Sequence, residues 1–188
     1  MTTGTIAITR KRIGLKRARQ GGIGAAFLAM ISPLLIGANS FAEGFEGRVL
    51  AAHNLERVRL GIAPLAWDNR LVASAQRWAD HLAASGQFEH APTENRWAPQ
   101  GENLWAGTRG YFSPEAMVDA WVREKRHFQQ GSFPNNSRTG NVEDVGHYTQ
   151  LVWRETGRVG CARAASASED ILVCRYLHAG NYIGERPF

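Results

Sequence analysis

The chain has 188 residues, 44% of them hydrophobic, and its 22 Lys and Arg residues exceed its 17 Asp and Glu residues by five. The positive excess belongs to the N-terminus, because residues 1–42 hold six of the basic residues and no acidic residue. Residues 43–188 therefore hold 16 basic and 17 acidic residues, a net charge of −1 that does not support a basic nucleic-acid-binding surface.

The N-terminal segment has the pattern of a secretory signal peptide. Basic residues precede an apolar stretch over residues 21–37, and the small residues Ser40 and Ala42 suit a cleavage site after Ala42. An uncleaved membrane anchor is the alternative, but the stretch contains glycines and a proline and is shorter than the roughly 20 apolar residues of a span. We therefore predict a signal peptide over residues 1–42 and one mature domain over residues 43–188, without stable membrane insertion after cleavage.

Capping residues and apolar spacing predict three helices. The first covers residues 45–60 and ends before Gly61, and the second follows Asp68, a good N-cap residue, and ends at Gly86. The third opens at Ser113, with proline in its first turn. The second helix has one apolar face, formed by Leu71, Ala75, Trp78 and Leu82.

The third predicted helix places an acidic residue on its apolar stripe. Met117, Trp121 and Phe128 form the stripe, and Glu124 lies three residues after Trp121 and four before Phe128. A buried carboxylate costs several kcal/mol unless it is paired, ligated or protonated. We therefore expect Glu124 to have a partner.

Four strands are predicted, over residues 102–108, 150–154, 159–165 and 171–177. The only two cysteines of the chain, Cys161 and Cys174, fall in the last two strands, which would form a hairpin. In an exported protein an even number of cysteines favours a disulfide. A Cys161–Cys174 bridge would contribute about 3 kcal/mol in the chain-entropy model. Two cysteines do not make a disulfide scaffold, so apolar burial must stabilise this fold.

The segment from Gly146 to Arg154 places His147 directly before an apolar, strand-like run. A histidine after a glycine and among Tyr, Thr and Gln is a candidate metal ligand or proton acceptor. A core histidine satisfied by neighbouring backbone explains this segment equally well. Other ligand-type residues at the same place would decide between the two interpretations.

Several short motifs stand along residues 45–188. They are His53-Asn54-x-x-Arg57, Pro64-Leu65-x-Trp67-Asp68, Gly101-Glu102-Asn103-Leu104, Trp121-x-x-Glu124, Gly146-His147-Tyr148-Thr149-Gln150-Leu151-Val152-Trp153 and Gly180-Asn181-Tyr182-Ile183-Gly184. In identity and spacing these motifs resemble the CAP superfamily, which comprises cysteine-rich secretory proteins, insect-venom antigen 5 and plant pathogenesis-related family 1.

The resemblance implies an α+β fold, a three-layer α-β-α sandwich with a mainly antiparallel central sheet. It also implies a cleft with two histidines and two glutamates, which in this chain are His90, Glu102, Glu124 and His147. Two neutral imidazoles beside carboxylates suit a divalent cation, zinc first, although the fold itself would require no cofactor. The alternative is a buried hydrogen-bonded network that only stiffens the core.

The chain also departs from the family. Ala91 stands where relatives often have serine, which removes the nucleophile that a Ser-His-Glu protease mechanism would require. The cysteines are fewer than in plant relatives, so only the terminal hairpin bridge carries over. His178 replaces a proline near the C-terminal motif, which puts the release of a C-terminal signalling peptide in doubt.

Three functions are compatible with these observations. The first is a secreted, non-enzymatic effector or binding module of pathogenesis-related type, which holds a lipid, a sterol or an extracellular protein partner. The second is a metal-dependent hydrolase with His90 and His147 as ligands and Glu102 or Glu124 as base. The third is a scaffold that acts through exposed loops. We favour the first function, because the chain has no His-Glu-x-x-His motif of a metalloprotease. We expect the protein to be a monomer that is extracellular or periplasmic.

Overall fold

The computed structural model describes residues 44–92 and 99–188. The predicted signal peptide, residues 1–42, lies outside the described residues. In chain order the elements are α2 (Phe45–Arg59), β1 (Ala66–Trp67), α3 (Asn69–Ser85), β2 (Gly101–Thr108), α4 (Pro114–Val122), η1 (Arg123–Arg126), η2 (Val142–Asp144), α5 (Gly146–Leu151), β3 (Arg158–Ala165) and β4 (Glu169–Leu177), where η denotes a 3-10 helix. Within the described ranges, no helix is both long enough and apolar enough to cross a membrane.

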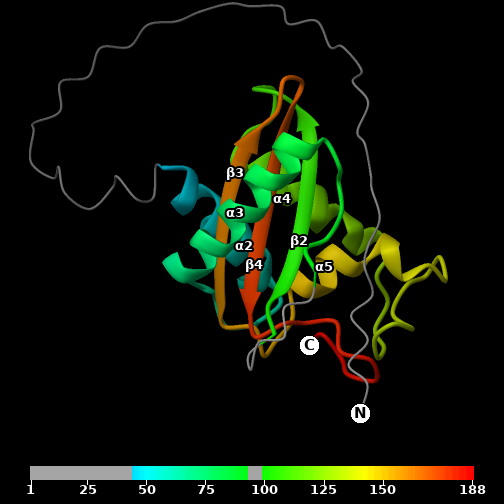
Figure 1. The fold of residues 1–188 in the computed structure, drawn as a ribbon. Helices are drawn as coiled ribbons and strands as arrows, with labels where there is room; N and C mark the ends of the chain where they lie inside the picture. The colour runs from blue at the N-terminus through cyan, green and yellow to red at the C-terminus, as the bar shows by residue number, and fades with distance from the viewer. Residues whose placement is uncertain (1–43, 93–98) are drawn as a thin grey trace, which may run out of the picture.

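The four strands form one mixed sheet in the order β1-β3-β4-β2. The long strands β3, β4 and β2 lie side by side (Figure 1) and pair antiparallel, as predicted, whereas the two-residue β1 pairs parallel with β3. Cys161 and Cys174 stand directly opposite each other on β3 and β4 and form the predicted disulfide. Because the sheet order leaves β2 at one edge, side chains of other elements can approach that edge.

Helices cover both faces of the sheet, which confirms the three-layer prediction. On one face the apolar stripe of α3, including Leu82, packs against side chains such as Val173 of β4. On the other face a larger core joins residues of α2, α4 and α5 to Leu172 and Cys174 of the same strand. The alternation of Leu172, Val173 and Cys174 between the two cores follows from the period of a strand.

The predicted boundaries of the first two helices and the predicted start of the third agree with the structure, whereas the third helix ends before Phe128. The Asp68 carboxylate accepts a hydrogen bond from the Arg70 amide at the start of α3, and Gly86 ends this helix with a φ of 69°. The Ser113 hydroxyl caps α4. The α-helix ends at Val122 and continues as η1, so Glu124 lies in a tight turn, and it is buried as predicted.

The predicted strand over residues 150–154 is wrong, because Gly146–Leu151 forms the short helix α5. A helix of six residues is not stable by itself, since its few hydrogen bonds do not offset the entropy of nucleation. Long-range contacts at both of its ends, described below, stabilise α5. These contacts leave no mark in the local pattern of apolar residues from which the strand was predicted.

Candidate functional site

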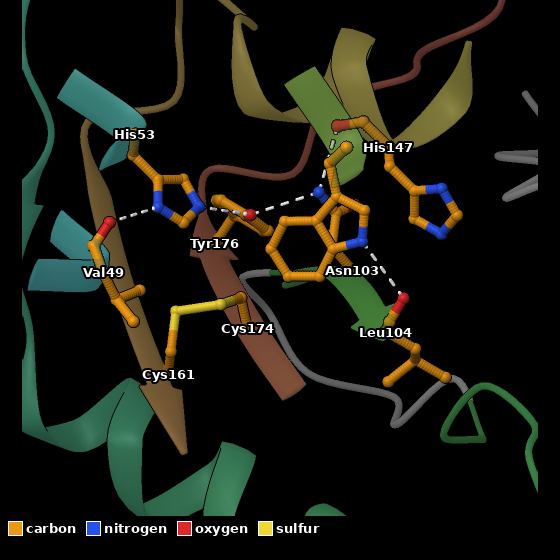
Figure 2. Close-up of a disulfide and its surroundings, with 9 residues drawn as sticks. Val49, His53, Asn103, Leu104, His147, Cys161, Cys174 and Tyr176 are labelled. Atoms are coloured by element: carbon orange, nitrogen blue, oxygen red, sulfur yellow. Dashed lines mark hydrogen bonds between the residues drawn. A yellow bond between two sulfur atoms is a disulfide. The ribbon is translucent and has the colours of Figure 1, made fainter. Parts of the chain in front are cut away.

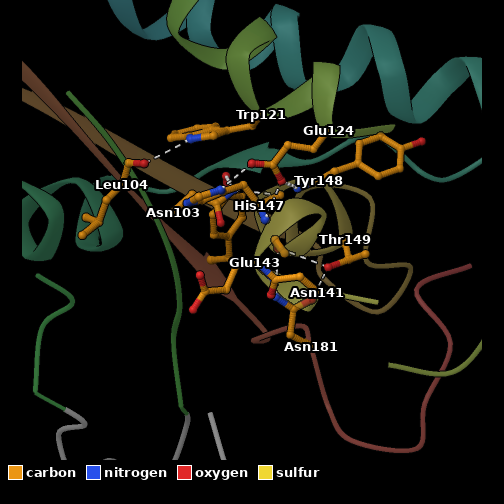
Figure 3. Close-up of polar contacts among 12 residues, drawn as sticks. Asn103, Leu104, Trp121, Glu124, Asn141, Glu143, His147, Tyr148, Thr149 and Asn181 are labelled. Atoms are coloured by element: carbon orange, nitrogen blue, oxygen red, sulfur yellow. Dashed lines mark hydrogen bonds and ion pairs between the residues drawn. The ribbon is translucent and has the colours of Figure 1, made fainter. Parts of the chain in front are cut away.

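Glu124 and His147 form a buried pair between η1 and α5 (Figure 3). One oxygen of the Glu124 carboxylate accepts hydrogen bonds from the backbone amides of His147 and Tyr148, each at 3.1 Å. The other oxygen lies 2.7 Å from His147 Nδ1. The carboxylate therefore caps the positive end of α5 and orients the imidazole at the same time. This is the partner that the sequence required for Glu124.

Neighbouring side chains also contact the ring and the backbone carbonyl of His147. Its ring stacks on Trp121 with a centroid distance of 6.1 Å, and the Trp121 indole N–H donates to the Leu104 carbonyl. The His147 carbonyl accepts a hydrogen bond from Asn103 Nδ2 at 3.0 Å. Among the described residues, the hydrogen bonds of the His147 ring involve Nδ1 and none involves Nε2.

Glu102, on β2, and His90 form a second pair. One oxygen of Glu102 lies 2.6 Å from His90 Nδ1 and accepts from the Ala91 amide at 3.1 Å. The other oxygen forms an ion pair of 2.9 Å with Arg175, which stands directly opposite Glu102 on β4. Along β2, Glu102 alternates with Asn103, so their side chains point to opposite faces of the strand: Glu102 contacts His90, and Asn103 contacts the His147 carbonyl.

A chain of hydrogen bonds runs from α2 to the His147 backbone carbonyl (Figure 2). His53 Nδ1 lies 2.8 Å from the Val49 carbonyl and therefore donates, so its Nε2 accepts from the Tyr176 hydroxyl at 2.9 Å. Tyr176 in turn accepts from Asn103 Nδ2, which also binds His147. Burial lowers the pKa of His53 to about 4 and raises that of Tyr176, so both stay neutral at pH 7.

Arg57 was named in the sequence only as part of a motif, and its structural role was not predicted. Its fully buried guanidinium donates to the carbonyls of Leu151, Trp153, Thr156 and Ala63, at 2.8 to 3.0 Å. Burial lowers its pKa to about 10, so it remains charged at neutral pH. Arg57 thus binds the negative end of α5, opposite to the end that Glu124 caps.

The structure brings the four predicted site residues together as two pairs. Among the described residues, one group of three or more His, Cys, Asp or Glu has its ligand atoms within 4.8 Å of one another, namely His53, Cys161 and Cys174. The disulfide occupies both sulfur atoms of that group, so it is not a metal site. The predicted cation site at His90, Glu102, Glu124 and His147 remains a prediction.

Two surface grooves lie away from these pairs, on either side of α2. The first, of about 600 Å³, runs between α2 and α4 and has Ala51, Leu55 and Val122 in its lining. Arg48 and Glu115 bridge it with contacts of 2.6 and 2.7 Å, and this hydrogen bonding lowers the pKa of Glu115 to about 2. The second, of about 510 Å³, lies near the C-terminal end of α2.

The motifs and the fold agree with a known family. The model of the CAP family, described as the cysteine-rich secretory protein family, matches residues 50–176. The chain belongs to this family. The matched range includes both His–Glu pairs and most of the helices and strands.

Relatives and solved structures of the CAP family support this assignment. Pathogenesis-related protein 1B of Nicotiana tabacum is 37% identical over 156 residues, covering 82% of this chain and 88% of the relative. The basic form of pathogenesis-related protein 1 from the same plant is 40% identical over 151 residues, covering 80% of this chain and 79% of the relative. The structure of BmVAL-1 has a TM-score of 0.62 at 24% identity, covering 74% of this chain and 79% of that chain. The structure of NaASP2 with Zn2+ has a TM-score of 0.61 at 24% identity, covering 75% of this chain and 83% of that chain. These two structures show the fold alone.

Proposed function

We propose that this CAP protein is an exported protein of pathogenesis-related type that acts by binding rather than by catalysis. The observation that carries the proposal is that both glutamates of the site are already engaged. Glu124 accepts three hydrogen bonds, and Glu102 binds His90, the Ala91 amide and Arg175. A carboxylate held in this way is a poor general base, and Ala91 supplies no nucleophile. The hydrolase alternative has no support from the site or from the relatives.

The hydrogen bonds between these glutamates and the two histidines also favour cation binding by the histidines. A histidine that binds a metal through one nitrogen commonly donates its other N–H to a carboxylate, which fixes the tautomer and the direction of the lone pair. Glu124 and Glu102 hold Nδ1 of His147 and His90 in this way. The glutamates would then orient the ligands, and the imidazoles would bind a Zn2+ ion beside β2. The structure of NaASP2 with Zn2+ is compatible with this role.

Zinc titration of the purified mature protein tests the cation site. We expect saturable binding of one Zn2+ at micromolar concentration by calorimetry, and at least about tenfold weaker binding in His147→Ala, because one of two nitrogen ligands is lost. His81→Ala, at an exposed position of α3, is the matched control and should bind as the wild type does. Equal zinc binding by the wild type and His147→Ala would contradict the assignment.

The groove between α2 and α4 favours an apolar ligand as a second function. Its volume of about 600 Å³ is within the usual range for small-molecule sites. Leu55, which is 57% exposed, lines the groove together with Ala51, Ala116 and Val122, so part of its surface is apolar. We therefore propose this groove as the place where the expected lipid or sterol would bind.

Filling the groove tests this second function. Ala51 lies in the lining and on the surface, so Ala51→Trp should fill the groove without disturbing the core. We expect a fluorescent long-chain fatty acid or cholesterol to bind the wild type saturably and to bind Ala51→Trp about tenfold more weakly. Ala84→Trp, on the exposed side of α3, should leave binding unchanged. Failure of both lipids to bind the wild type would refute the lipid role.

A further inference from the structure

The second groove, near the C-terminal end of α2, has a composition that neither proposed role uses. It has a volume of about 510 Å³, and its lining includes three cationic and three aromatic side chains. These are Arg59, Lys125, Arg138, Phe128, Tyr148 and Phe188. We call this groove the cationic pocket. None of the four residues of the His–Glu pairs lines it.

The cationic pocket has an excess of positive charge. Its one acidic lining residue, Glu56, is 3% exposed and is already bound by Lys125, with N–O distances of 3.2 and 3.4 Å, and by the Tyr148 hydroxyl at 3.3 Å. Arg59 lies farther from Glu56, at 3.8 Å. Arg138 is exposed and makes no ion pair with any residue that the structure describes. The three cations and one acid leave the pocket attractive to an anion.

Aromatic rings form one side of the cationic pocket. Phe128 lies edge-to-face against Tyr148, with centroids 5.5 Å apart, and stacks with Phe188 at 5.4 Å. Phe128 and Tyr148 belong to the buried core, and the partly buried Phe188 packs against this core at the pocket. A flat ring can pack against such a surface in an offset or edge-to-face arrangement. Inorganic anions make no use of this contact, whereas planar organic anions do.

We infer that the cationic pocket binds a planar organic anion, a carboxylate or sulfonate carried on an aromatic ring. The acidic group pairs with Arg138 and Arg59, and the ring packs against the aromatic side formed with Phe128 and Phe188. Guanidinium groups suit this role, because their donors match two oxygens of a carboxylate or sulfonate. The site is distinct from the cation site and from the lipid groove, although Glu56 and Arg59 border both grooves.

Binding of 8-anilinonaphthalene-1-sulfonate to the full mature chain tests the inference, with fluorescence as the readout. Arg138→Glu should weaken binding about tenfold, since it removes one attraction and adds a repulsion. Arg70→Glu changes the net charge equally but lies at an exposed position at the start of α3, outside the linings of both grooves. It should change the affinity less than about twofold. Equal effects of the two substitutions would overturn the inference, as would the absence of binding to the wild type.

Two further experiments distinguish this site from a site for any anion and from the lipid groove. Unlabelled naphthalenesulfonate should displace the probe, and inorganic phosphate at the same ionic strength should not; equal displacement by phosphate would show a site for any anion and overturn the inference. Ala51→Trp fills the lipid groove and should leave probe binding unchanged. Loss of probe binding in Ala51→Trp would place the probe in the lipid groove and also overturn it. Failure of the lipid or zinc experiments leaves all of these outcomes unaffected.

Discussion

Replacing Arg57 by leucine is expected to lower the free energy of unfolding by about 4 kcal/mol, because it leaves several buried carbonyl groups without a donor. The guanidinium is fully buried and donates to four carbonyls, among them those of Leu151 and Trp153 at the end of α5. Water cannot replace these hydrogen bonds without opening the core. The positive charge also lies at the negative end of a helix too short to be stable alone.

Urea denaturation followed by circular dichroism measures this effect, with two comparison variants. Arg57→Lys keeps the charge but cannot reach four carbonyls, so we expect a loss of about 2 kcal/mol. Arg59→Leu lies two residues away on the same helix, with its side chain 61% exposed, and should stay within about 0.5 kcal/mol of the wild type. A loss for Arg57→Leu no larger than that for Arg59→Leu would show that the carbonyl contacts contribute little.

Replacing Glu124 by glutamine is expected to weaken zinc binding about 10- to 100-fold while the fold is kept. Two backbone amides, of His147 and Tyr148, point at one carboxylate oxygen, so the amide oxygen of glutamine must take that position. The amide NH2 group then faces His147 Nδ1 and donates to it. The proton of the imidazole moves to Nε2, and the lone pair that would bind the cation is lost.

Nitrogen-15 NMR of the histidine rings and zinc calorimetry test this prediction together. In the wild type, His147 should be the Nδ1–H tautomer, and in Glu124→Gln it should be the Nε2–H tautomer. Glu155→Gln removes an exposed carboxylate just beyond α5 and is the matched control. An unchanged tautomer with weakened zinc binding would contradict the mechanism, and an unchanged affinity would show that His147 is not a ligand.

Local chemistry was sufficient to predict several parts of this protein from sequence. Asp68 and Gly86 bound α3 because the cap accepts a backbone N–H and glycine adopts a positive φ without strain. The apolar stripe of the third helix placed Glu124 inside, where it is found. The disulfide also followed from two predicted strands joined by a short turn. Each of these signals depends on residues close together in the sequence.

The sequence by itself thus determined the family, the long helices, the hairpin with its disulfide, and the need of Glu124 for a partner. Only the tertiary structure decided that Gly146–Leu151 is a helix, because Glu124 and Arg57 come from distant elements to bind its two ends. It also decided how the four predicted site residues are arranged. They form two His–Glu pairs, one between β2 and the segment after α3 and the other between η1 and α5. Long-range contacts of this kind have no local pattern, so spacing along the chain could not reveal them.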